Sequence, residues 1–233
     1  MAVGLLIGVS SCTSNDETTI VYPGSENYFK PFAELCGTDT VQNPSTGMFT
    51  SVYEAMIENS MVDYEKNVGI FPPNIEGSWK MNQYYCKYST DPDDQIYVDE
   101  EIVINPRTVT FSNQNNRIGS YSSKQGGGTQ TADTLYIMGR ENKFAAWCEV
   151  KDEQSSGSYN WKNIIVCLYT GELSTDAEGN RGIKDMKYAF YIREMDFGFT
   201  LTHQDSVNLS SLNSVGTLKV YWEKDNYADE VIE

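Results

Sequence analysis

The side chains that most often carry enzyme chemistry are scarce or scattered in this chain. It has one histidine, His203, so the common zinc sites and a His-dependent catalytic triad both lack parts. His203 follows Phe199 and Leu201 at two-residue spacing, so in a strand all three side chains lie on the same face. We expect His203 to be a hydrogen-bonded residue at the end of that strand. The 33 Asp and Glu residues provide many carboxylate pairs, and a glycosidase needs only two, but spacing singles out none. We predict no catalytic residue.

Two acidic segments have the oxygen ligands that calcium prefers. They are Asp91-Pro92-Asp93-Asp94 and Asp176-Ala177-Glu178-Gly179-Asn180. Neither completes an EF-hand loop, and Asp, Asn, Gly and Pro are also the residues that form turns. We therefore expect both segments to be turns, and we predict no metal ion and no cofactor.

A cysteine near the N-terminus has the surroundings of a lipidation site. Apolar residues 3–9 precede two serines and then Cys12. This order resembles the lipobox of bacterial lipoproteins, in which a signal peptide, here residues 1–11, is removed and the cysteine is acylated. Two or three acyl chains, at about 0.8 kcal/mol per buried methylene, make a permanent membrane anchor. The polar run after Cys12 suits a tether, and the alternative is a buried N-terminal strand.

Residues 14–17, Ser-Asn-Asp-Glu, resemble the acidic tether of surface lipoproteins in Bacteroidota. Thr13 follows Cys12 where an Asp would signal retention in the inner membrane of enteric bacteria. We therefore expect an outer-membrane lipoprotein, and of the two faces of that membrane the tether favours the cell surface.

Four further cysteines, Cys36, Cys86, Cys148 and Cys167, are far apart and have no CxxC or metal-ligand spacing. Three of them lie in apolar, strand-like stretches, and a buried free cysteine behaves as a small hydrophobe, so free thiols are our main expectation. Export would permit a disulfide. The pair would then be Cys148 and Cys167, because their predicted strands are consecutive.

The composition describes a globular and acidic protein. A chain of 233 residues is long enough to bury a sizeable core. With 17 Lys and Arg against 33 Asp and Glu, the net charge is −16, which disfavours a nucleic-acid partner. No run of about 18 apolar residues is present, so no membrane-spanning helix is expected.

The N-terminal third is predicted to be irregular and then helical. Residues 12–44 form the lipidated tether and an irregular segment, in which Lys30-Pro31 is one of several breakers. Residues 45–74 form a helical extension. Between Met48 and Met61, apolar residues recur every three or four positions, which predicts one amphipathic helix of about four turns.

From residue 75 to 223 the pattern is that of β-strands, because apolar and polar residues alternate. Residues 161–170 are apolar almost throughout, as in a strand covered on both faces. Short links, among them residues 113–116, 139–142 and 194–196, require antiparallel neighbours. We predict a mainly β, antiparallel up-and-down barrel, with a β-sandwich as the alternative. Residues 224–233 are expected to be an acidic tail.

The predicted barrel opens with Ile75-Glu76-Gly77-Ser78-Trp79. Gly-x-Trp at the start of the first strand resembles lipocalins and related calycin barrels, and the resemblance covers residues 75–223. It implies that Gly77 allows a close turn and that the Trp79 indole closes one end of the barrel. These families place an arginine of the last strand on that tryptophan, and Lys219 is the nearest cation there.

Three functional hypotheses follow. The first, implied by the lipocalin-like barrel, is a lipid-anchored binding protein for a small apolar or amphipathic ligand. The second is a glycan-capturing surface lipoprotein that uses aromatic residues near predicted loops, such as Tyr121, Tyr159 and Trp161. The third is a carboxylate-dependent hydrolase.

Overall fold

The structure is a computed structural model. It describes residues 26–62, 69, 71–82, 84–91, 106–125, 128–156, 159–199, 216–223 and 227–232. Among these residues, no helix is long and apolar enough to cross a bilayer. The predictions for Cys12, the tether and His203 fall outside the described residues.

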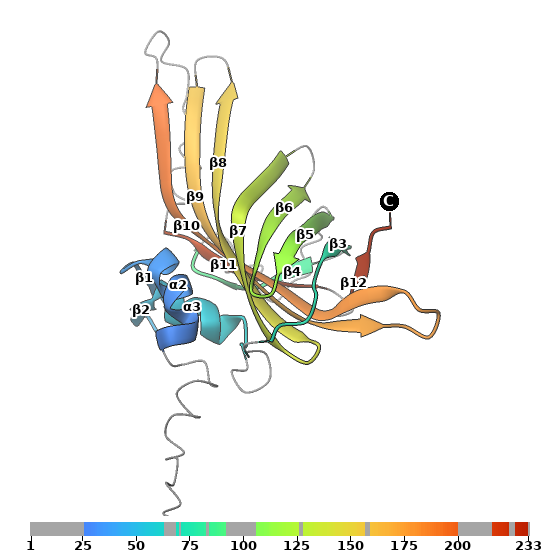
Figure 1. The fold of residues 1–233 in the computed structure, drawn as a ribbon. Coiled ribbons are helices and arrows are strands. Elements are labelled where there is room, and N and C mark those ends of the chain that lie inside the picture. The colour runs from blue at the N-terminus through green and yellow to red at the C-terminus, as the bar shows by residue number, and fades with distance from the viewer. Residues whose placement is uncertain are drawn as a thin grey trace, which may run out of the picture.

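Eight antiparallel strands close into an up-and-down barrel (Figure 1), which confirms the predicted fold and excludes the sandwich. In order around the barrel they are β3 (Gly77–Met81), β5 (Arg107–Asn115), β6 (Ile118–Gln125), β7 (Gly128–Arg140), β8 (Lys143–Ser156), β9 (Tyr159–Thr175), β10 (Arg181–Phe199) and β12 (Tyr227–Glu230). The last strand, β12, pairs with both β10 and β3 and so closes the sheet. Closure through β12 pairs the edges of β3 and β10 that an open sheet would leave exposed.

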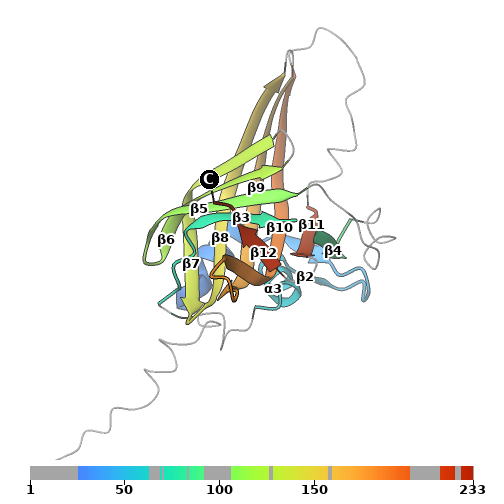
Figure 2. The same cartoon turned by 90° about the vertical axis from the view of Figure 1, so that its right-hand side faces the viewer.

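Two further strands continue the sheet beside β10. The strand β11 (Leu218–Glu223) pairs with β10, and β4 (Tyr84–Ser89) pairs with β11. Both β11 and β12 lie along the same edge of β10, one after the other, as Figure 2 shows from the side.

Two predictions within the barrel are wrong. The expected acidic tail, residues 224–233, contains β12, whose Ala228 is fully buried in the barrel. The expected turn at residues 194–196 lies within β10, because the segment pairs with β9 and a bulge between Ile192 and Glu194 absorbs the irregularity. Neither residue run contains the Gly or Pro that would have forced a break.

Three other turns that the sequence marked are present, whereas residues 92–94 of the second expected acidic turn fall outside the described residues. The β5–β6 hairpin turns at Asn116, whose φ is +56°, and the β7–β8 hairpin turns at Glu141, whose φ is +58°. Asp176 closes the β9–β10 turn by accepting hydrogen bonds from the backbone N–H and the side-chain amide of Asn180, each at 2.8 Å. Gly128 begins β7 opposite Gln125.

The barrel encloses one hydrophobic core, which we call the inner core. Its members alternate along each strand, as for Phe144, Ala146, Cys148 and Val150 in β8. The opposite face of β8, with Ala145 and Trp147, packs outside the barrel in a second cluster, the outer core. The strand β9 is covered on both faces, as predicted, because it lies between the two cores. Its Cys167 points into the inner core and its Leu168 into the outer core.

Within the residues that the structure describes, two helices, rather than the one predicted, cover the outer core (Figure 1). The helix α2 (Glu26–Cys36) was expected to be irregular because it contains Pro31. Its residues Phe29, Phe32 and Cys36 lie on one face and are fully buried, and the Phe29 ring stacks on Trp147 at 5.0 Å. This packing outweighs the local cost of the proline.

The second helix, α3 (Val52–Asn59), is half as long as predicted. Ser51 and Glu54 form a capping box that starts it, and the preceding residues form a short hairpin of β1 (Thr40–Gln42) and β2 (Phe49–Ser51). Met48 and Met61, assigned to the buried stripe, are 69% and 59% exposed. The apolar spacing was therefore correct only between Val52 and Ile57.

Candidate functional site

One end of the barrel is sealed around Trp79, the tryptophan of the Gly-x-Trp motif. Its side chain is fully buried, and its indole Nε1 donates a hydrogen bond to the Ile75 carbonyl at 3.0 Å. The guanidinium carbon of Arg181, from β10, lies 5.1 Å from the centre of the indole ring. In lipocalins a cation of the last strand packs on this tryptophan, and here Arg181 of β10 makes that cation–π contact instead.

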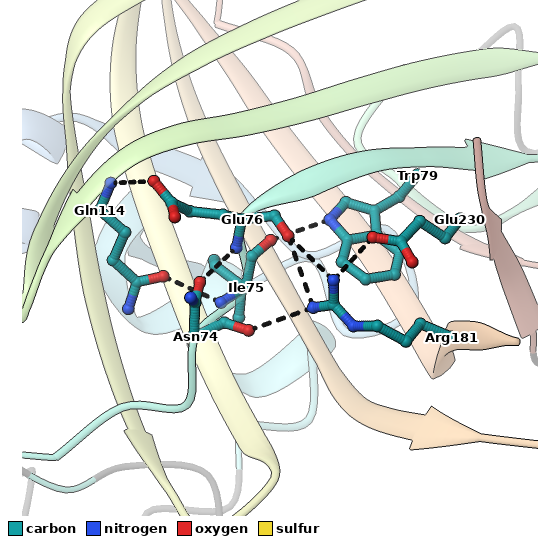
Figure 3. Close-up of polar contacts among 7 residues, drawn as sticks. All are labelled: Asn74, Ile75, Glu76, Trp79, Gln114, Arg181 and Glu230. Carbon is teal, nitrogen blue, oxygen red and sulfur yellow. Dashed lines mark hydrogen bonds and ion pairs between the residues drawn. The ribbon is translucent and has the colours of Figure 1, made fainter. Parts of the chain in front are cut away.

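Arg181 links the chain segment before β3 to the last strand of the barrel (Figure 3). Its Nη1 lies 2.7 Å from the Glu230 carboxylate, and its two Nη atoms donate to the Glu76 carbonyl at 3.4 Å. Gln114 secures the same segment from β5, because its Oε1 accepts from the Ile75 N–H at 2.9 Å. Residues 74–76 are therefore held across this end of the barrel.

Position 77, at the sealed end, accommodates only glycine. Its φ is +147°, a backbone conformation that L side chains rarely adopt. A Cβ there would lie 2.9 Å from the Glu230 carboxylate and 3.1 Å from the Trp79 ring. The close approach of strand, indole and carboxylate thus explains the glycine of the motif.

Farther along the barrel, the interior holds a buried arginine. Arg107, at the start of β5, is 8% exposed, and its side chain has the inward parity of Val109 and Phe111. Its Nη1 donates to Ser123 Oγ at 2.8 Å and its Nη2 donates to Gln125 Oε1 at 2.6 Å. Its guanidinium also lies 4.5 Å from the centre of the Tyr188 ring.

Tyrosines connect this arginine to the rest of the interior. The Tyr188 ring stacks on Tyr169 at 4.6 Å, and the hydroxyl groups of Tyr169 and Tyr121 are 2.8 Å apart. Burial raises the pKa of all three phenols, so they are neutral hydrogen-bonding groups at neutral pH. We call Arg107, Ser123, Gln125, Tyr121, Tyr169 and Tyr188 the interior polar cluster.

Gln130 adds an unsatisfied group next to this cluster. It lies directly opposite Ser123 in the β6–β7 pair. Its Oε1 is buried and has no hydrogen-bond partner in the part of the chain that the structure describes. A buried acceptor without a partner costs about 1–3 kcal/mol, which a hydroxyl or N–H group of a ligand would recover.

Solvent reaches the aromatic residues beside the cluster. Phe190 and Tyr221 pack against the inner core but are only partly buried, whereas Trp79, at the sealed end, is fully buried. Tyr188 stacks on Phe190 at 5.5 Å and on Tyr221 at 6.3 Å. The interior therefore runs from a closed apolar end to a more accessible region with aromatic faces and a guanidinium. Such an arrangement can receive an apolar body and a polar or anionic end.

The four cysteines after Cys12 are free thiols and are buried. Cys148 and Cys167 lie directly opposite one another in the β8–β9 pair, but the disulfide considered for them is not formed. Burial raises the pKa of Cys148, which keeps it a thiol, and the Sγ of Cys167 lies 3.7 Å from the Tyr188 hydroxyl. Cys167 thus joins the edge of the interior polar cluster.

Other residues singled out from the sequence lie apart from this site. Lys219 does not reach Trp79; its Nζ forms an ion pair with Asp91 at 3.3 Å. Tyr121 is 2% exposed inside the barrel and is no exposed platform for a glycan. The side chains of Tyr159 and Trp161 lie outside the described part of the chain.

Sequence reasoning missed both arginines of the site, Arg107 inside the barrel and Arg181 at its sealed end. Arg107 precedes Val109 and Phe111 with their parity, so a charge at an inward position was a readable signal. Arg181 follows the hairpin tip at residues 176–180 and gave no such signal, because its contacts are with Trp79 and Glu230, far away in the chain.

Fold and site together define a closed, lipocalin-like eight-stranded barrel with one sealed end and a polar cluster inside. Comparisons of the chain with models of protein families, with curated proteins and with solved structures give no match.

Proposed function

We propose that this protein is a lipid-anchored, exported binding protein that holds a small amphipathic ligand inside its barrel. The observation that carries the proposal is the interior polar cluster around Arg107. A guanidinium and three tyrosines inside a barrel are costly to bury and unnecessary for filling it, since apolar residues fill the sealed end.

The arrangement of the cluster favours a ligand with an anionic end. Arginine presents a planar fork of N–H donors that suits carboxylate groups. The ring faces of Phe190 and Tyr221, which are partly exposed, provide apolar contact on the accessible side of the cluster. A fatty acid or a similar molecule with one carboxylate and an apolar body has this pair of properties.

A titration with cis-parinaric acid, a fluorescent fatty acid, tests this proposal. We expect saturable binding at one site. Arg107→Met should weaken binding of the acid about tenfold, the value of one charged hydrogen bond, and change binding of its methyl ester much less. Arg117→Met, at an exposed turn position, is the matched control. If the acid does not bind, or if acid and ester respond alike to Arg107→Met, the proposal is wrong.

The membrane anchor is a separate part of the proposal and rests on the lipobox-like residues before Cys12. Labelling of cells with radioactive palmitate is expected to mark the wild-type protein. Cys12→Ala should abolish the label, and Cys36→Ala, which changes a buried thiol of α2, should retain it. Label that persists in Cys12→Ala would contradict the lipid anchor.

A further inference from the structure

The barrel wall is interrupted between β7 and β8. The two strands pair only over residues 135–140 and 143–148. Beyond that point, residues 128–132 of β7 pair with β6 alone and residues 149–156 of β8 pair with β9 alone, among the residues described. Figure 1 shows β7 bending away from β8 there. We call this divergence of two strand edges the fork.

A β-bulge in β7 accounts for the fork. Ala132 lies opposite Tyr121 and Leu135 lies opposite Gly119, so Asp133 and Thr134 share a single residue on β6 as their counterpart. An extra residue of this kind bends its strand and ends the pairing on the other side. Bulges at such positions are often associated with binding sites rather than with errors of pairing.

An open groove of about 450 Å³ lies at the fork. Its lining comes from the end of α2 and from both diverging strands, and comprises Leu35, Thr131, Ala132, Asp133, Thr134, Tyr136, Glu149 and Lys151. The volume is within the range of pockets that bind small molecules. The Tyr136 ring is held nearly parallel to the Trp147 ring, at 6.0 Å, and gives the groove a fixed apolar surface.

The charge of the groove is uneven. Glu149 is neutralised by Arg193, whose Nη2 lies 2.8 Å away, and by Lys151 at 3.8 Å. Asp133 is exposed and has no ion pair within the described part of the chain. Together with the net charge of −16, this carboxylate favours a basic partner.

We propose that the fork binds an extended, basic peptide segment of another protein, which adds a strand along the edges of β7 and β8. Main-chain hydrogen bonds to the two edges would provide affinity, as in other cases of strand addition. A basic side chain would face Asp133, and an apolar one would contact Leu35 and Tyr136. This site is outside the barrel, and the proposal does not depend on a ligand inside it.

A second copy of this chain is the other candidate for an exposed strand edge. Its net charge of −16 opposes self-association. The experiment below reports this outcome separately.

Hydrogen exchange of the whole chain with a defined probe tests the proposal. The probe is the capped peptide Thr-Lys-Val-Lys-Val-Lys-Thr, and two further peptides keep its alternation with Arg for Lys or Ile for Val. At about ten times its Kd, the probe should slow amide exchange at residues 131–134 and 149–151 about tenfold. A version N-methylated at the valines, which lacks the N–H donors, should not.

Charge reversal then separates the fork from non-specific attraction. Asp133→Lys should weaken binding of the probe about fivefold or more, as expected for replacing an attraction by a repulsion at an exposed site. Glu141→Lys, the same charge change at the exposed turn of the same hairpin, should leave it unchanged. The proposal is overturned if no peptide slows these amides, if the two variants bind alike, or if a dimer of the chain protects the same amides without peptide.

Discussion

At the scale of single residues, the sealed end of the barrel depends on the absence of one side chain. Gly77 has a φ of +147°, and a Cβ there would meet the Glu230 carboxylate at 2.9 Å. We expect Gly77→Ala to lower the free energy of unfolding by about 1–3 kcal/mol, through overpacking and backbone strain. Urea denaturation measures the change. Gly179→Ala is the control, because its φ of +91° is also strained but its Cβ would meet no atom within 4 Å. Equal losses in the two variants would assign the whole effect to the backbone.

At the scale of elements, α2 exists because its aromatic face packs on the barrel. Phe29 is fully buried and stacks on Trp147 at 5.0 Å. Phe29→Ala should cost about 3–5 kcal/mol of stability, the usual range for a truncated core aromatic. Phe49→Ala, at a position that is 67% exposed, should cost far less. Thermal or urea unfolding of the two variants compares them, and a small loss for Phe29→Ala would mean that α2 is not part of the cooperative unit.

The start of α3 should make its stability depend on pH. Hydrogen bonds from Ser51 and then Thr50 lower the pKa of the Glu54 carboxyl below its ordinary value of 4.5. The stabilisation is therefore present above pH 4.5 and is lost as the pH falls through the lowered pKa of the folded state. The stability difference between wild type and Glu54→Gln should shrink on acidification in urea unfolding. Glu58→Gln, the same change near the other end of α3, is the control. A constant difference for Glu54→Gln would contradict the capping role.

At the scale of the whole molecule, the barrel is closed by a strand of four residues. β12 pairs with β10 and β3, buries Ala228 and supplies the Glu230 carboxylate to Arg181. Removal of residues 224–233 should lower the free energy of unfolding by about 3 kcal/mol or more, at about 1 kcal/mol for each lost hydrogen bond. Removal of residues 232–233 alone, where Ile232 is 84% exposed, should change it little. A similar stability for both truncations in urea would show that closure contributes little.

The strands of the barrel could be read from the sequence because their cause is local. Alternation at Phe144, Ala146 and Cys148 places one face of β8 inside, and short turns such as residues 113–116 require antiparallel neighbours. The motif residue Trp79 could be found for the same reason, since it is defined by its neighbours in the chain. These features depend on a period and on turn chemistry, which a sequence contains in full.

What the sequence by itself determined was therefore the mainly β class, the order of most strands and the face on which their apolar residues lie. Only the tertiary structure decided that Tyr227–Glu230 closes the barrel and that α2 forms in spite of Pro31. It also decided that Arg107 lies inside the barrel against Tyr188 and that Arg181 packs on Trp79 at the sealed end. Each of these depends on partners distant in the chain. Burial and pairing with such partners outweigh local preference, and no spacing in the sequence records them.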